Sequence, residues 1–310
     1  MPAALEAPEP GGLFDHRAPL LGLRAEDRLD LALADDRVHP AAEPEVGEDL
    51  DEVDPAHRSA VDEVLALTAA VEAAHGRGVQ VVVVGGGTAG VELALAAQAR
   101  LCGFGREEGA VTLVETMPRI LPERPSAAGA AERALTRNRV RVRAGVAARA
   151  ATATALLLAD GSTVPADVLI WATGAGSTDL LRSSGLVTDG QGFVLVKDTL
   201  NSVSDPLVFA AGDAATLETY PATPKAGVYA VREGAVLSHN LAVACRGDGP
   251  LRRYVPQPRF LTLLNTGDGR AILSYGPLTL TARWVMTLKD WIDRRFVARF
   301  RSISVRTAGQ

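Results

Sequence analysis

Cysteine is almost absent from this chain of 310 residues, which has only Cys102 and Cys245, far apart in the sequence. Two isolated thiols exclude a disulfide framework, a metal site of cysteine-histidine spacing and a neighbouring pair that could act as a redox disulfide. The five histidines are scattered, which favours surface or packing roles over a catalytic base. The sequence therefore predicts no metal site.

Long hydrophobic runs and an excess of basic charge are missing as well. No stretch approaches the roughly 20 apolar residues that cross a bilayer, and the first residues lack the basic and apolar regions of a secretory signal. The formal net charge of −5 argues against a nucleic-acid partner. We expect a cytoplasmic protein, with peripheral contact at the inner face of the membrane as an additional possibility.

The N-terminal part lacks sustained periodicity. Residues 1–59 are rich in Ala, Asp, Glu, Pro and Arg and carry an acidic cluster at 45–52, so we expect this segment to be loosely structured. Apolar residues at near-helical spacing follow within 60–77. They predict a helix that docks beside the sheet that comes next.

A run of four valines that passes through a glycine turn into a helix is the most informative feature of the chain. The glycines have the spacing of a dinucleotide-binding turn. Gly85 permits the tight turn, Gly87 lets the backbone approach a pyrophosphate, and Gly90 lets the helix pack on the strand. Thr88 and Ala89 lie in the same turn, where the helix N-terminus attracts phosphate, and we expect them to contact the cofactor.

An acidic residue, Glu115, ends the next apolar run at 111–115. In this position a carboxylate accepts hydrogen bonds from the adenosine ribose and repels a 2′-phosphate, so the sequence favours NADH over NADPH. Arg119 stands four residues later and could instead attract a 2′-phosphate. The preference for NADH is therefore an expectation that Arg119 could weaken.

Alternating strand and helix patterns continue through the chain and predict a parallel sheet. The first series consists of strand 79–84, helix 89–102, strand 111–115, helix 126–138, a strand near 140–143, and a short meander over 152–158 and 168–172 with a turn at 160–161. The second consists of strand 193–196, strand 207–211, helix 224–245, strands 260–264 and 271–275, and helix 280–300.

Three motifs in this order resemble the FAD-dependent pyridine nucleotide-disulfide oxidoreductase superfamily. They are Gly85–Glu92, similar to its NAD(P) turn, Trp171–Gly174, similar to its interdomain crossing, and Phe209–Asp213, similar to its second flavin motif. The resemblance implies an α/β flavoprotein fold with two Rossmann-like dinucleotide-binding domains, an NAD(H) domain at 78–174 and the C-terminal part of an FAD domain at 175–248. A small α+β element at 249–310 would follow.

The resemblance also implies roles for single residues. Asp213 would bind the flavin ribityl chain, and the helix that begins near Lys225 would point its positive N-terminus at the isoalloxazine. Glu92 resembles a family carboxylate near the nicotinamide, which it would help to place. The positions implied on the flavin side are Thr173, Gly174, Gly212, Asp213, Pro224 and Lys225.

The C-terminal stretch resembles the NADH dehydrogenase-like module that is fused to selenide, water dikinase, and is similar in layout to type II NADH dehydrogenases. This implies that electrons pass from NADH through FAD to a quinone or another small acceptor, because the chain lacks a disulfide pair. The helix within 280–301 combines an apolar face with a basic rim. It could contact a membrane surface, or dock in the core or in a homodimer.

The first FAD phosphate turn of the superfamily has no counterpart before residue 78. We therefore expect an N-terminus that is truncated or frame-shifted and FAD binding that is impaired. The alternative is a flavin-free remnant that acts as an NAD(H)-binding or protein-interaction module.

Overall fold

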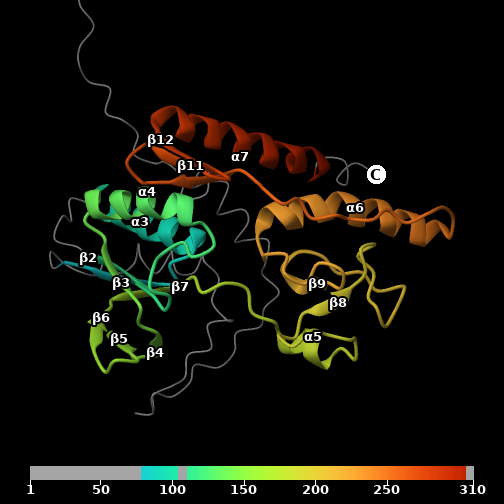
Figure 1. Ribbon diagram of the computed structural model, residues 1–310, viewed down its shortest axis with the longest axis horizontal. Coiled ribbons are helices and arrows are strands. Elements are labelled where there is room, and N and C mark those ends of the chain that lie inside the picture. Colours follow the sequence, from blue (N-terminus) through green and yellow to red (C-terminus); the bar gives the residue numbers. More distant parts are fainter. Residues whose placement is uncertain (1–77, 104–109, 305–310) are drawn as a thin grey trace, which may run out of the picture.

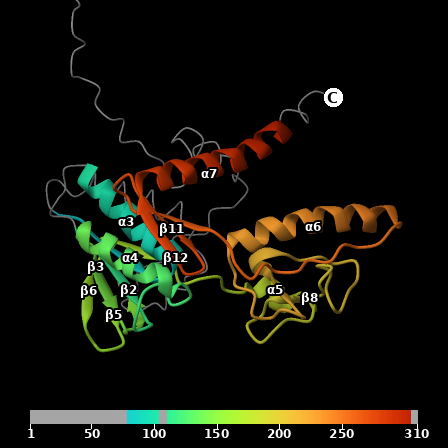
Figure 2. The same cartoon turned by 45° about the horizontal axis from the view of Figure 1, so that its top comes forward.

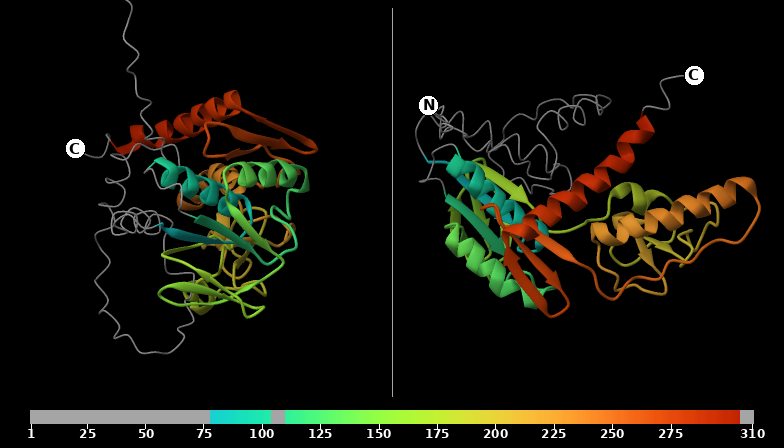
Figure 3. Two further views of the ribbon diagram at one scale, coloured as in Figure 1. Left: turned by 90° about the vertical axis from the view of Figure 1, so that its left-hand side faces the viewer. Right: turned by 90° about the horizontal axis from the view of Figure 1, so that it is seen from above.

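The computed structural model describes residues 78–103 and 110–304. The segment 1–59 and the docking helix expected within 60–77 lie outside the described residues. Figure 1 shows two lobes connected by extended segments of chain. Seen from above in Figure 3, the lobes lie next to each other along the long axis of the molecule.

The first lobe is built on a four-stranded sheet in the order β3-β2-β1-β7, with every neighbouring pair parallel. Its central strand contains the four valines, which are at most 5% exposed. A strand buried on both faces needs such an apolar run, and this confirms the strand expected there. The strands are β1 (Gln80–Val84), β2 (Ala110–Glu115), β3 (Arg141–Ala144) and β7 (Val168–Trp171).

Each face of this sheet has its own cover. Helices α3 (Thr88–Gly103) and α4 (Pro125–Arg137) pack on one face through small side chains such as Ala94 and Ala131, both fully buried. Leu156 and Leu158 pack on the other face from a three-stranded antiparallel meander. The meander consists of β4 (Ala148–Ala151), β5 (Ala155–Leu158) and β6 (Thr163–Pro165).

The C-terminal element packs on the helices of the first lobe. Its antiparallel strands are β10 (Thr262–Asn265), β11 (Ala271–Tyr275) and β12 (Leu278–Ala282), and α7 (Arg283–Ser304) follows. Leu264 and Ile272 are fully buried in the same core as α3 and α4. Figure 2 shows α7 lying across this small sheet.

The expected start of the last helix at residue 280 is wrong. Residues 278–282 form β12, which pairs with β11 so that Leu280 faces Leu273, and the helix begins only at Arg283. The alternating leucines and threonines at 278–281 favour a strand, because β-branched threonine suits the pleated surface.

The second lobe has a much smaller sheet. It contains α5 (Asp179–Ser183), the parallel pair β8 (Val194–Val196) and β9 (Ala215–Leu217), and the long helix α6 (Gly227–Arg246). Val196 and Leu200 are fully buried in a core to which α6 contributes Tyr229.

The strand expected at 207–211 is also wrong. This stretch forms a single antiparallel bridge, between Phe209 and Asn201, and the strand that pairs with β8 comes later, at Ala215–Leu217. A strand needs a continuous hydrogen-bonding neighbour, whereas this stretch pairs with 200–202 only around Phe209, where the N–H of Ser202 donates to the Val208 carbonyl oxygen and the N–H of Ala210 to that of Leu200. Leu207 is accordingly 80% exposed.

Candidate functional site

The three glycines between β1 and α3 have different surroundings. A Cβ on Gly85, whose φ is +110°, would lie 2.3 Å from the Ala172 carbonyl oxygen, and one on Gly90 would lie 1.7 Å from the Gly85 carbonyl oxygen. A Cβ on Gly87 would meet no atom within 4 Å. The fold therefore requires glycine at Gly85 and Gly90, whereas Gly87 leaves open space beside the backbone.

The open side of Gly87 adjoins the first turn of α3. The helix begins at Thr88, and Ala89 in the same turn is exposed. The first N–H groups of a helix have no intrahelical acceptor and carry a partial positive charge. The turn can thus receive a phosphate group without any rearrangement.

Glu115 braces this turn from the end of β2. One carboxylate oxygen accepts the N–H of Gly86 at 2.5 Å, and the other accepts the N–H of Met117 at 2.7 Å. The residue is 9% exposed. Each carboxylate oxygen can accept more than one hydrogen bond, so Glu115 can still accept a ribose hydroxyl. Arg119 is largely exposed, with a guanidinium nitrogen 4.0 Å from Glu132.

Glu92 lies against the C-terminal element. Its carboxylate accepts the N–H of Asn265 at 3.1 Å and is 3.5 Å from Nζ of Lys289, which is 3.2 Å from Asp293. Burial raises the pKa of Glu92, and Lys289 opposes this shift. Burial also acts to lower the pKa of Lys289, but the carboxylates of Glu92 and Asp293 raise it overall. The three groups connect α3 with α7.

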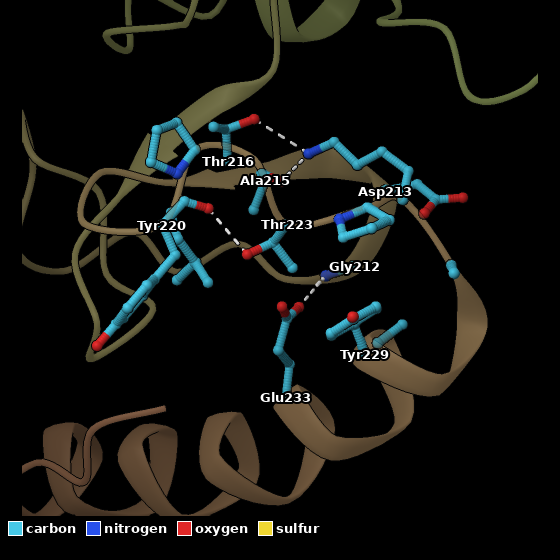
Figure 4. A pocket seen from close by; sticks show the side chains of 14 residues that line it. Gly212, Asp213, Ala215, Thr216, Tyr220, Thr223, Tyr229 and Glu233 are labelled. Atoms are coloured by element: carbon cyan, nitrogen blue, oxygen red, sulfur yellow. Dashed lines mark hydrogen bonds between the residues drawn. The ribbon is translucent and has the colours of Figure 1, made fainter. Parts of the chain in front are cut away.

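A second site lies in the other lobe, in the pocket of Figure 4. Gly212 and Asp213 form a 3-10 turn ahead of β9, and the N–H of Gly212 donates to the carboxylate of Glu233 on α6 at 2.6 Å. Asp213 is exposed, and its carboxylate points away from Glu233 (Figure 4). Tyr229 lines the pocket from the first turns of α6.

Lys225 is held on the β9 side of this pocket. Its ammonium donates to the Ala215 carbonyl oxygen and to the Thr216 hydroxyl, and it lies 4.3 Å from the ring centre of Phe193. Burial lowers the pKa of Lys225, and nearby carboxylates, including that of Asp213, oppose the shift.

The N-terminus of α6 opens toward the same pocket. Pro224 and Ala226 line the pocket just before the helix. Ala226 caps the helix without a side-chain hydrogen bond. The N–H of Tyr229 already donates to the Ala226 carbonyl oxygen, which leaves the N–H groups of Gly227 and Val228 at the helix start to face an electron-rich ligand.

The predicted site residues fall into two groups, one around the glycine turn at Gly85–Gly90 and one around the pocket at Gly212, and Thr173 and Gly174 lie outside the pocket. Thr173 follows β7 and lies beside the glycine turn, since its backbone nitrogen is 3.1 Å from a Cβ built on Gly85. Gly174 is exposed and follows in the connection to the second lobe. Neither Thr173 nor Gly174 lines the pocket at Gly212.

Sequence reasoning missed Glu233 and Tyr229. They stand four residues apart on α6 and are at most 7% exposed, so they share one helix face. This spacing, close to a recognised glycine-aspartate turn, was the available signal.

Three further properties bear on the chemistry. In the part of the chain that the structure describes, no group of three or more His, Cys, Asp or Glu side chains could hold a metal ion. Cys102 lies on α3 and Cys245 on α6, and both are exposed. Among the described helices, none combines the length and the apolar character that a membrane span requires.

A glycine turn that joins a parallel strand to a helix, an acid at the end of the next strand and a glycine-aspartate turn beside a long helix define a dinucleotide-binding α/β protein. The model of the pyridine nucleotide-disulphide oxidoreductase family matches residues 42–234. The chain belongs to this family. The match begins well before residue 78, the first residue that the motifs had indicated.

Two curated relatives are similar to part of the chain. A type II NADH:quinone oxidoreductase of Haemophilus influenzae is 34% identical over 149 residues, which cover 45% of this chain and 34% of the relative. An NADH dehydrogenase-like protein of Mycobacterium tuberculosis is 33% identical over 140 residues, which cover 44% of this chain and 35% of that protein. The matches thus span about a third of the length of each relative.

Solved structures share the fold. The sulfide:quinone oxidoreductase of Aquifex aeolicus has a TM-score of 0.61 at 17% identity, covering 76% of this chain and 61% of that one. NDH2 of Plasmodium falciparum, solved in complex with NADH, has a TM-score of 0.55 at 12% identity, and the match covers 69% of this chain and 64% of that one. At these identities the likeness concerns the fold alone, and it confirms the Rossmann-like α/β fold that the sequence predicts.

Proposed function

We propose that this chain is an FAD-dependent oxidoreductase that passes electrons from NADH to a quinone or another small diffusible acceptor, without a redox-active disulfide. The observation that carries the proposal is the open glycine turn at Gly87 in the same chain as the glycine-aspartate turn at Gly212. The separate placement of the two cysteines, on α3 and α6, supports transfer without a disulfide.

The residues around Gly87 fit a dinucleotide. The open space and the first turn of α3, with Thr88 and Ala89, would receive the pyrophosphate. Glu115 would accept a ribose hydroxyl. Its negative charge would repel the 2′-phosphate of NADPH, whereas exposed Arg119, which lies 4.0 Å from Glu132, would attract it. We propose a preference for NADH on these grounds.

The residues around Gly212 fit the flavin end of FAD. Asp213 would accept the ribityl hydroxyls, and the uncapped N-terminus of α6, next to Pro224 and Lys225, would stabilise electron-rich flavin. Thr173 and Gly174 would line the passage between the two cofactors. Bound flavin would supply the two-electron chemistry between NADH and the acceptor. Within residues 78–103 and 110–304 there is no second phosphate-binding glycine turn, and we propose that FAD binding is weakened accordingly.

The nicotinamide would lie between the two sites, placed by the backbone of the glycine turn, because hydride donors react through proximity and orientation. Glu92 remains our candidate for placing it. Its contacts with Asn265 and Lys289 favour an indirect action, in which Glu92 holds the C-terminal element against α3.

Helix α7 offers a surface for a larger partner. Val285 is fully buried, whereas Trp284 and Trp291 are 55% and 58% exposed. The apolar face expected for this helix is thus split between a docked side and an outward side. We propose that the outward tryptophans contact a membrane surface or a second copy of the chain, the former giving a cytoplasmic protein peripheral on the inner membrane face.

A visible absorption spectrum tests the proposed function. A yellow protein whose flavin band near ~450 nm is bleached by NADH agrees with it. Calorimetry that detects no NADH binding would contradict it.

The second candidate function is a flavin-free NAD(H)-binding or protein-interaction module. The presence of a single phosphate-binding glycine turn within the described ranges favours it. A colourless protein that binds NADH but cannot be reconstituted with FAD would support this alternative.

A further inference from the structure

Glu233 is a buried acid on the second site. The residue is 5% exposed, and its carboxylate accepts the N–H of Gly212 at 2.6 Å. Figure 4 shows the Glu233 side chain reaching from α6 across the pocket to the turn that carries Asp213. The contact joins α6 to this turn across 21 residues of sequence.

The charge of Glu233 has no close cation. Within the described residues Glu233 forms no ion pair, and the charged groups that act on it are Lys225, which lies across the pocket, and Asp213. Tyr220 and Tyr229 also line the pocket. Burial raises the pKa of Tyr254, Glu233 and Tyr229 add to this shift, and Arg232 opposes it. Desolvation raises the pKa of Glu233, and the Gly212 hydrogen bond and Lys225 lower it less than burial raises it.

Holding the Gly212 N–H does not require a charge. A neutral amide oxygen would satisfy the same donor without the cost of burying a carboxylate. The ionised form adds strength to the hydrogen bond, because a charge-assisted bond is roughly twice as strong as a neutral one. A costly buried charge beside a pocket is a signal of function rather than of packing.

We propose that Glu233 is a positioning residue of the flavin site, which holds Gly212 so that Asp213 projects toward the ribityl chain and which makes FAD retention depend on pH. The inference rests on the proposed function. Ionised Glu233 holds the turn firmly, and protonated Glu233 holds it less firmly. FAD affinity therefore decreases as the pH falls through the pKa of Glu233.

The stability of the fold changes in the opposite direction. An acid whose pKa is raised in the folded state contributes stability below its ordinary pKa of 4.5, and this contribution is lost as the pH rises through the folded value. Acidification should thus lessen the cost of burying Glu233 while it weakens FAD binding. A purely structural role would move stability and FAD affinity together.

The test compares two substitutions of Glu233 with a matched control. Glu233→Gln keeps an acceptor for Gly212 without the charge, and Glu233→Leu removes the acceptor. Glu218→Gln, at an exposed position just after β9, controls for a change of net charge. FAD affinity is measured by the quenching of flavin fluorescence over a pH series that starts below the ordinary carboxyl pKa of 4.5 and extends upward to about pH 8.

We expect the native chain and Glu218→Gln to lose FAD affinity on acidification and Glu233→Gln to have a flat profile. Glu233→Leu should bind FAD about tenfold to a hundredfold more weakly, because the Gly212 N–H is left unsatisfied. An unchanged pH profile in Glu233→Gln would overturn the inference. If Glu233→Leu fails to fold, the profile of Glu233→Gln still decides.

The amide resonance of Gly212 separates this inference from the proposed function. In NMR spectra of the cofactor-free protein it should titrate with a raised pKa, and this titration should vanish in Glu233→Gln. If no variant binds FAD, the proposed function fails while this titration still supports the contact. If the Gly212 resonance does not titrate, the inference fails even when FAD binds.

Discussion

The two lobes differ in how complete their sheets are. The first lobe has four parallel strands covered on both faces, with β1 at the centre. The second has two parallel strands of three residues each, and the apolar run at 207–211 lies without a strand alongside it. The glycine turn of the first lobe is thus positioned by a full core, whereas the Gly212–Asp213 turn of the second depends on a few contacts, among them Glu233 with Gly212.

The largest expected effect comes from the glycine turn of the first lobe. Gly90→Ala should destabilise the fold by at least about 3 kcal/mol, because the new Cβ would collide with the Gly85 carbonyl oxygen. Gly87→Ala is the matched control. Its Cβ meets no atom within 4 Å, so we expect its free energy of unfolding to stay within about 0.5 kcal/mol of that of the native chain. We also expect it to lose NADH affinity. Urea unfolding and calorimetry measure the two effects.

Equal stability of Gly90→Ala and Gly87→Ala would contradict the interpretation that the turn requires glycine at Gly90 but not at Gly87. Unchanged NADH binding by Gly87→Ala would contradict the phosphate site.

The C-terminal sheet should contribute to the stability of the first lobe, because its strands share the core of that lobe. Leu264→Ala is expected to cost about 2–5 kcal/mol, because it empties a fully buried position that the helices of the first lobe share. Leu278→Ala, at a position 60% exposed on β12, should cost less than about 0.5 kcal/mol. Urea unfolding followed by circular dichroism gives both values. A Leu264→Ala chain as stable as the control would mean that the C-terminal sheet is only loosely attached.

A smaller effect is expected at the contact between α3 and α7. Lys289→Met should destabilise the fold by roughly 1–3 kcal/mol, because it leaves the carboxylate of Glu92 buried beside Asp293 without its cation. Since burial already raises the pKa of Glu92, the loss should grow as the pH rises above 4.5. Unfolding at about pH 5 and pH 8 checks the direction, and Glu92→Gln combined with Lys289→Met should largely restore stability. A loss that is independent of pH would refute this explanation.

The smallest effect concerns the choice of nucleotide. Glu115→Gln removes the charge and keeps an acceptor oxygen for one of the two N–H groups, of Gly86 and Met117, that the carboxylate accepts, so we expect the preference for NADH over NADPH to fall about tenfold. Glu123→Gln, on the exposed loop before α4, is the charge control. Titrations with both nucleotides measure the ratio. An unaltered ratio would assign the discrimination to another group.

The contrast between the lobes also explains what the sequence could predict. The glycine turn, Glu115 and the strands of the first sheet follow from local patterns, and the structure has them where they were expected. The strand at 207–211 was wrongly predicted because pairing depends on distant chain. Glu233 was missed because a glutamate on a helix resembles a solvated residue until its partner in another segment is known.

Leu280 was assigned to the start of the last helix for a related reason. It stands shortly before Trp284 and could begin the same helical face, and only its pairing with Leu273 of β11 identifies it as part of a strand. Local spacing therefore predicted the strand, turn and helix around Gly85–Gly90, whereas features that depend on contacts between distant segments were missed or wrongly predicted.

The central claim is that both sites act together in one oxidoreductase. Its most direct test is to load the purified chain with FAD, remove free flavin, and follow the absorption band near ~450 nm while NADH is added without oxygen. The account predicts a yellow protein that is bleached by NADH and recovers its colour when a quinone is added. A protein that binds NADH but remains colourless after incubation with FAD would contradict the account.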